Sequence, residues 1–595
     1  MATMAYVQGK WSLEDLFPGF DTPDLDRGFQ DLEKRVGAFE GVRSKLSSDM
    51  ELGLFTESLR QYEQAVRKLA RLYAFGYLRF AEDTQDTQAQ SFFARVQQLG
   101  ADFDNRTMFF KLWWKGLEEA PAGRLMAAAG DDRYWLEALR LEKPHTLSEP
   151  EEKVINLKNV NGAAALVNLY DSITNRYTFK MEEDGRVKEI TREELMDYVR
   201  NANPDLRAAA YRELYRVYRQ DVPTLAQIYQ YRARDWRSEN VGLRRYASPI
   251  ATRNLSNNIP DPVVDTLLEV CRANAKLFQR YFRLKARWLG MDRLRRYDIY
   301  APISKSERTY AFADGVELVL KSFARFDEEV AGLARRVLDE RHFDSEVRKG
   351  KMGGAFCLSA EPSLTPWILG SYKGRPDDVM TLAHELGHAI HGLLAAHHSM
   401  LAADPSLPLA ETASTFSEML VMDRLMEIEK DPLVQRDLLF REIDDAYATI
   451  MRQAYFASFE RTGHEIIHNG GGLEDLKEAY RKNLEEQFGD SVELSEDFNI
   501  EWAAIPHFYQ QPFYVYAYTF GQLLVLSLYQ QYRKEGDSFK PRYLGILRAG
   551  GSDAPMRILE GAGIDVRQGS FWQGGFNVLQ AALERLEAIE VPARG

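Results

Sequence analysis

Apolar residues recur about every 3.6 residues along most of this chain, which is the pattern of amphipathic α-helices. The pattern is clearest at Asp205–Tyr218, Pro262–Leu289 and Leu473–Phe488, where charged residues fill the opposite face. We find no fixed-period repeat and no low-complexity tract. The sequence therefore predicts a mainly α-helical fold.

Strand patterns are few, and they predict two short pairs. Ser172–Met181 and Arg186–Ile190 flank a turn at 182–185, and Thr191 then begins a capping box for the next helix. We interpret this hairpin as the boundary between an N-terminal helical lobe, residues 1–190, and a second region, residues 191–595.

The second pair, Gly354–Ser359 and Pro366–Tyr372, predicts a small β-sheet before residue 376. An unpaired edge of such a sheet can bind the backbone of an extended peptide. A small buried sheet with no substrate role fits the same pattern.

Length and composition indicate a globular protein of more than one lobe. The 595 residues exceed one ordinary core, so we expect two or three lobes. A net charge of −13 argues against nucleic acid and against an anionic membrane surface as partners. No apolar run is long enough to span a membrane. Only two cysteines and no signal-peptide pattern predict a cytoplasmic location. The oligomeric state is not indicated.

The strongest chemical signal is the sequence TLAHELGHAIHGL at 381–393, which contains H-E-x-x-H. On a helix, His384 and His388 share one face, so they can bind one Zn²⁺, and Glu385 can act as a base on water. Pro376 and the two aspartates after it predict the helix start.

A surface helix with two solvated histidines is the alternative interpretation. The apolar residues of the segment, however, form a face opposite to the two histidines, which favours a metal site. These residues are Val379, Leu382, Ala383, Leu386, Ile390, Leu393 and Leu394.

A catalytic zinc ion needs a third protein ligand. His391 lies about 10.5 Å along the helix from His384, too far to share one ion, and is a second-shell or surface residue instead. His391 and Leu394 also stand where an extended H-E-x-x-H-x-x-G-x-x-H site has glycine and histidine, which excludes that class. Glu411 is the better candidate. Glu418 follows on the same face, so one carboxylate could bind metal while the other orients a histidine, although two solvated surface acids fit equally.

A histidine and several tyrosines occur close together near residue 507. His507 precedes a predicted helix, Pro512–Tyr532, whose tyrosines fall on different faces. A histidine and a tyrosine hydroxyl can both stabilise an oxyanion. The ordinary interpretation is that these rings belong to the core.

HELGHAIH followed by AETASTFSE resembles the M3 family of zinc peptidases, and the oligoendopeptidase F group in particular. Further segments similar to that group occur in order along nearly the whole chain. They are Trp11–Gly19, Gly353–Cys357, Gly370–Gly374, Ile505–Tyr509, Pro512–Tyr516 and Gly550–Pro555.

The resemblance implies a two-lobed helical body around a deep substrate channel, with 191–595 as the catalytic region. It implies three zinc ligands, a general base and two oxyanion donors. These are His384, His388 and Glu411 as ligands, Glu385 as base, and His507 with Tyr516 as donors. Because Gln510–Pro512 makes a shorter connection than in more distant relatives, Tyr514 and Tyr518 remain alternatives to Tyr516.

We therefore predict a zinc endopeptidase that binds one Zn²⁺ per chain and hydrolyses internal bonds of short oligopeptides. A helical zinc carboxypeptidase and a non-catalytic peptide-binding protein with structural zinc are the alternatives. Cleavage preference, peptide length limit and the extent of hinge closure are not indicated by the sequence.

Overall fold

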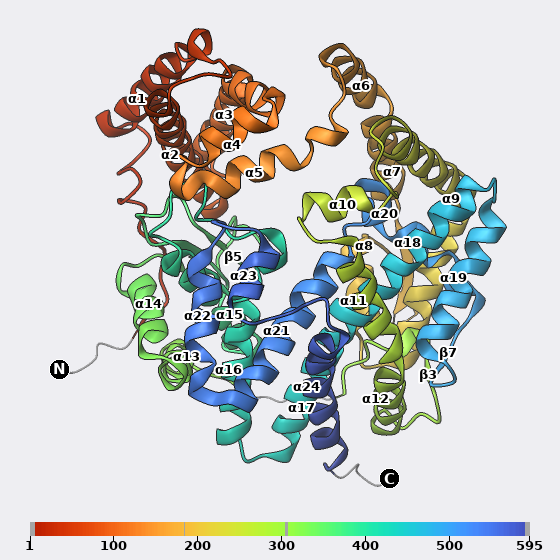
Figure 1. Cartoon of the computed structure of the whole chain (residues 1–595). Helices are drawn as coiled ribbons and strands as arrows, with labels where there is room; N and C mark the ends of the chain where they lie inside the picture. The colour runs from red at the N-terminus through yellow and green to blue at the C-terminus, as the bar shows by residue number, and fades with distance from the viewer. Residues whose placement is uncertain (1–5, 184, 304–307, 590–595) are drawn as a thin grey trace. The chain divides into compact units, whose positions relative to one another are not determined.

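Helices dominate the computed structural model of the chain, which describes residues 6–183, 185–303 and 308–589 (Figure 1). The mainly α-helical prediction is confirmed. By compactness the chain divides into two units, each built from three separate segments. The first unit comprises Met1–Lys143, Glu307–Ile428 and Gln531–Asp565; the second comprises Pro144–Ser306, Glu429–Gln530 and Val566–Gly595. The predicted boundary at residue 190 thus falls inside the second unit.

The first unit combines an N-terminal helical bundle with the segments that carry the H-E-x-x-H helix. Its helices are α1 (Pro23–Glu40), α2 (Leu52–Glu82), α3 (Thr87–Gly116), α4 (Glu119–Met126), α5 (Arg133–Leu141), α13 (Phe312–Phe326), α14 (Glu328–Asp339), α15 (Pro376–Leu394), α16 (Ser414–Ile428), α22 (Lys540–Ala549) and α23 (Pro555–Gly561). Helices α1, α2 and α3 pack side by side, as the red and orange ribbons of Figure 1 show.

Aromatic side chains fill the core of that bundle. Phe55 and Trp114 stack at 5.7 Å between ring centroids, and the Trp114 indole N–H donates to the Leu136 carbonyl at 2.8 Å. A buried indole therefore adds apolar contact without an unpaired donor. Trp367 serves the same purpose further along the chain, since its indole N–H donates to the Ser12 carbonyl at 2.7 Å.

A three-stranded sheet lies beside α15 in the first unit. Its strands are β4 (Phe343–Asp344), β5 (Phe356–Leu358) and β6 (Trp367–Leu369), in the order β4-β6-β5. Strand β6 is parallel to β4 and antiparallel to β5. The predicted pair next to the H-E-x-x-H helix is thus confirmed, with shorter strands, and β5 is an edge strand of this sheet. A two-residue strand such as β4 is too short to show alternation of apolar and polar residues, so it could not be predicted from the sequence.

A loop from the end of the first unit crosses the segment that follows α15. Gly551 N–H donates to the Ala402 carbonyl at 2.9 Å. Gly550 has a φ of +50°, and a Cβ there would meet the Ala403 carbonyl oxygen at 2.4 Å. Glycine at both positions permits this close crossing.

The second unit is also helical. Its helices are α6 (Glu149–Asn161), α7 (Ala163–Asn175), α8 (Arg192–Val199), α9 (Pro204–Arg237), α10 (Ala251–Ser256), α11 (Asp261–Ala273), α12 (Ala275–Trp288), α17 (Pro432–Ala446), α18 (Arg452–His468), α19 (Leu473–Phe488), α20 (Pro506–Gln510), most of α21 (Tyr516–Glu535) and α24 (Gly569–Glu587). Its strands are β1 (Phe179–Glu183), β2 (Arg186–Ile190), β3 (Leu294–Arg295) and β7 (Val492–Glu493).

Several predicted boundaries differ from the structure for local reasons. The hairpin is confirmed as antiparallel β1 and β2, but α7 extends to Asn175, so the first strand begins later than predicted. Asp184, in the predicted turn, lies outside the described residues. Asn274 divides the helix predicted at 262–289 into α11 and α12.

Among the described helices, none combines the length and the apolar character needed to cross a lipid bilayer.

A buried ion pair holds the second unit together at the start of α9. The Arg207 guanidinium is 1% exposed and donates to the Asp298 carboxylate, itself 0% exposed, at 2.9 and 3.0 Å. The same guanidinium donates to the backbone carbonyls of Asn201 and Ala202, so these two acceptors before α9 have hydrogen-bond partners. Removing one member would leave the other charge buried without its partner.

We expect Asp298→Ala to lower the free energy of unfolding by about 3–5 kcal/mol, because Arg207 would stay buried without a carboxylate. Glu478→Ala is the matched control, because its ion pair with Lys482 is exposed and contributes little to stability. Urea denaturation of both variants measures the difference, and equal midpoints would show that the buried pair does not stabilise this unit.

Candidate active site

The H-E-x-x-H helix α15 begins where the sequence predicts. Pro376 occupies its first turn, and the Asp378 carboxylate accepts the backbone N–H groups of Lys373 and Arg375, both at 2.9 Å. These bonds satisfy donors in the segment entering the helix and place a negative charge near the positive end of the helix dipole. These hydrogen bonds therefore fix the first turn of the helix that carries the two histidines.

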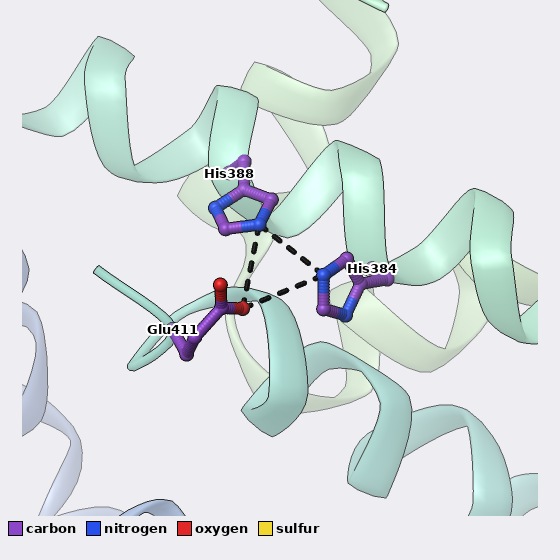
Figure 2. A group of neighbouring side chains, drawn as sticks. All are labelled: His384, His388 and Glu411. Atoms are coloured by element: carbon purple, nitrogen blue, oxygen red, sulfur yellow. Dashed lines mark hydrogen bonds and ion pairs between the residues drawn. The ribbon is translucent and has the colours of Figure 1, made fainter. Parts of the chain in front are cut away.

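Three side chains of the first unit meet at one point (Figure 2). The Nε2 atoms of His384 and His388 are 3.2 Å apart, and each lies 3.4 Å from Oε2 of Glu411. About a quarter of each histidine side chain is exposed, so small molecules can reach the group.

These distances fit a zinc ion. Ligand atoms at about 2.0–2.1 Å from zinc in tetrahedral geometry are about 3.3 Å from one another. The three atoms are also chemically suited, since two imidazoles and one carboxylate are the ligand set of one class of catalytic zinc sites. The residues present therefore fit a single zinc ion.

Two neighbouring side chains orient two of the three, His384 and Glu411. Oε1 of Glu418, on α16, lies 2.6 Å from Nδ1 of His384, which places the proton on Nδ1 and leaves Nε2 free to face the group. The Ser414 hydroxyl donates to Oε2 of Glu411 at 2.6 Å. Glu411 lies in the turn before α16 rather than on the helix that the sequence predicts. Ser414 was not identified from the sequence, where only its position three residues after Glu411 hints at this contact.

Gly387 allows α15 to approach the start of α16 closely enough for Glu411 to reach the histidines. A Cβ on Gly387 would lie 2.5 Å from the Ser414 Cα and 2.7 Å from the Ala413 carbonyl oxygen. Both atoms belong to the backbone and cannot swing aside. Glycine directly before His388 is therefore required by the packing of α15 against the start of α16.

Glu385 is almost fully buried, 6% exposed, beside the group. Its Oε2 has no hydrogen-bond partner among the described residues. Burial raises the pKa of Glu385 to about 7; the charges of Glu411 and Glu418 add to the shift, and His384 opposes it. The protein's own groups thus favour a carboxyl group that exchanges a proton near neutral pH.

The histidines differ in their environments. Burial lowers the pKa of His384, but the hydrogen bond to Glu418 and the nearby carboxylate charges outweigh it and raise the pKa to about 9. Burial lowers the pKa of His388 below its ordinary value. His391, predicted to be a second-shell or surface residue, is 2% exposed, and burial lowers its pKa to about 3. It lies outside the group formed by His384, His388 and Glu411.

The predicted oxyanion donors lie in the second unit. Nε2 of His507, on α20, is 3.4 Å from the Tyr518 hydroxyl. The Tyr514 ring lies parallel to the His507 ring at 6.2 Å between centroids and edge-on to the Tyr518 ring at 5.3 Å. Tyr516, the tyrosine favoured by the sequence, is instead 0% exposed, and its hydroxyl accepts the Asn257 side-chain N–H at 2.9 Å.

Sequence comparison finds relatives that are described as peptidases. The profile described as Peptidase family M3 matches residues 198–578, and that described as Oligopeptidase F matches residues 125–179. Oligopeptidase PepF of Bacillus subtilis is 26% identical over 98% of this chain and 87% of its own length. An oligoendopeptidase F homolog of Borreliella burgdorferi is 27% identical over 96% of this chain and 98% of its own.

Solved structures show the same fold. A candidate peptidase from Chlamydophila abortus superposes with a TM-score of 0.89 at 24% identity, covering 98% of each chain. Oligoendopeptidase-F from Enterococcus faecium superposes with a TM-score of 0.70 at 23% identity, covering 95% of this chain and 98% of its own.

We expect Gly387→Ala to weaken metal binding, because the added methyl group forces α15 and the turn bearing Glu411 apart. Overpacking of this kind also costs about 1–3 kcal/mol of stability. Gly332→Ala, on α14, is the matched control, since nothing lies within 4 Å of its Cβ position. This control gains about 0.5–1 kcal/mol from helix propensity. Titration calorimetry with zinc compares the variants; equal affinities would show that the contact at Gly387 does not position Glu411.

Proposed function

Because this chain belongs to peptidase family M3, whose members are generally zinc-dependent, we propose that it hydrolyses internal bonds of short oligopeptides with one zinc ion per chain. The observation that carries the proposal is the triangle of donor atoms from His384, His388 and Glu411, with sides of 3.2–3.4 Å. Relatives named as oligoendopeptidases over nearly the whole chain support the substrate class.

Glu385 is the proposed general base. A bound zinc ion would polarise the scissile carbonyl and make water a better nucleophile at neutral pH. Glu385 accepts the proton of the water as it attacks the carbonyl carbon, and then delivers that proton to the nitrogen of the leaving amine. Its buried carboxylate with a free Oε2 is suited to both transfers.

His507 and one tyrosine are the proposed donors to the oxyanion. Tyr518 is 38% exposed, and its hydroxyl lies near Nε2 of His507, whereas the Tyr516 hydroxyl is already bonded inside the second unit. We therefore favour Tyr518, with Tyr514 as the alternative, over the Tyr516 predicted from the sequence.

The edge strand β5 is the proposed docking site for the substrate backbone. It belongs to the sheet that packs on α15, and its free edge offers N–H and C=O groups to an extended peptide. The charge of Glu385 adds to the effect of burial in raising the pKa of Cys357, the central residue of β5, so this strand runs close to the proposed base.

A carboxypeptidase would use the same zinc ligands but require a free C-terminus on the substrate. A structural zinc site would usually have four protein ligands, whereas the group in the described residues offers three, which disfavours a non-catalytic role. The cytoplasmic location stays a prediction from the sequence.

We expect the wild-type protein to cut a peptide with blocked N- and C-termini at internal bonds, as mass spectrometry of the products will show. Glu385→Gln should keep one zinc ion per chain and lose about 10²–10⁴-fold in rate, since general acid–base catalysis is worth that much. Cleavage that needs a free C-terminus would support the carboxypeptidase instead, and wild-type turnover by Glu385→Gln would remove Glu385 as the base.

We expect Glu418→Gln to weaken zinc binding about 10–100-fold, because the carboxylate no longer stabilises the Nδ1-protonated form of His384. Glu427→Gln, an exposed glutamate on the same helix, is the control and should bind zinc as the wild type does. Competition with a chromogenic chelator measures both affinities. An unchanged zinc affinity in Glu418→Gln would show that this hydrogen bond does not tune the ligand.

A further inference from the structure

The connection between α20 and α21 holds an unusual backbone conformation directly before Tyr514. Phe513 has a φ of +60°, which lies in the left-handed region that residues other than glycine rarely adopt. The Phe513 side chain is 1% exposed and packs against His464 at 4.6 Å between ring centroids. This conformation also explains why α21 begins at Tyr516 rather than at the predicted Pro512.

A buried carboxylate and an arginine hold the two edges of one peptide group in this connection. The Phe513 N–H donates to Oε1 of Glu460, on α18, at 2.7 Å. The carbonyl of the same peptide group, that of Pro512, accepts from Nε and Nη2 of Arg253, on α10, both at 3.4 Å. Nearby, Nε of Arg232, on α9, donates to the Tyr509 carbonyl at 3.0 Å. Three helices thus fix a connection of a few residues.

The position of Glu460 is costly, which argues that it serves more than packing. The side chain is 1% exposed, and its Oε2 has no hydrogen-bond partner among the described residues. Burial raises the pKa of Glu460 to about 8, against the opposing effects of the Phe513 N–H and Arg253. An apolar side chain would fill the same space without burying an acid, and such costs are concentrated at functional sites.

The same peptide group lies next to the rings proposed to stabilise the oxyanion. Tyr514 is the next residue, and the Arg253 guanidinium lies 5.8 Å from the centre of its ring. Tyr514 in turn packs on Tyr518 and His507. A change in the Pro512–Phe513 peptide plane would therefore rotate Tyr514 and displace the two groups that contact it.

We propose that Glu460 and Arg253 are positioning residues that hold the left-handed Phe513 and thereby fix the arrangement of Tyr514, Tyr518 and His507, the proposed oxyanion donors. This inference rests on the proposed function. Neither residue touches the substrate in this scheme; each acts through the Pro512–Phe513 peptide group. Orientation errors of about 1 Å can cost about 100-fold in rate, so the effect should be large.

The test compares two substitutions of similar size. Glu460→Gln keeps an oxygen that can accept the Phe513 N–H, and Glu460→Met does not. We expect Glu460→Met to lose about 100-fold in kcat on an internally quenched peptide, with a smaller change in KM and an unchanged zinc content. Glu460→Gln should restore most of kcat. Glu465→Met, exposed on the same helix, should behave as the wild type.

A double-mutant cycle separates positioning from general destabilisation. If Glu460 acts through the tyrosines, Glu460→Met should cost far less in a Tyr514→Phe/Tyr518→Phe background than in the wild type. Equal kcat values for Glu460→Met and Glu460→Gln, or additive effects in the cycle, would overturn the inference.

Hydrogen exchange of the Phe513 amide measures its hydrogen bond to Glu460 without a catalytic assay. Exchange should be faster in Glu460→Met than in the wild type and in Glu460→Gln; equal protection in all three would also overturn the inference. If the wild type cuts no internal bond, the proposed function fails, and the exchange result still decides whether Glu460 holds this peptide group. If Tyr514→Phe and Tyr518→Phe each keep wild-type kcat, the tyrosines lose their proposed role independently of Glu460.

Discussion

The backbone contact at Gly387 is the constraint on which the arrangement of the active site depends. The two proposed metal ligands on α15 can be predicted from their spacing, but the proposed third ligand, Glu411, comes from a different segment and must lie within a few ångströms of them. Here that distance is set by two backbones in contact, with Ser414 and Glu418 completing the alignment. The two imidazoles and the carboxylate suit zinc, while the absence of a side chain at Gly387 allows them to come together.

Much of this site could be predicted because its parts are local. One helix, α15, contains the apolar period and the four-residue spacing of the two histidines. It also begins at Pro376, as predicted. Local patterns predicted less about Glu411. Its spacing made it a candidate, but the structure brings it to the histidines from a turn rather than from a helix.

The remaining differences arise from contacts between residues far apart in the sequence. No local pattern could place Phe513 in the left-handed region, because Glu460 holds it from 53 residues away. The left-handed Phe513 delays the start of α21, and the structure places the Tyr516 hydroxyl on Asn257 while Tyr514 and Tyr518 lie near His507. Likewise, a boundary drawn at one point along the chain cannot represent two units that each use three segments.

The three-segment construction has a consequence for how the protein is made. Domains usually fold in order as the ribosome releases them. Here α22 packs on α15, and the loop at Gly550 and Gly551 closes over Ala402 and Ala403, so the unit that bears the proposed zinc site stays incomplete until these later segments have been made. A nascent chain therefore carries His384 and Glu385 long before it can close the unit around them, and we expect the proposed peptidase activity only after α22 and this loop have been added.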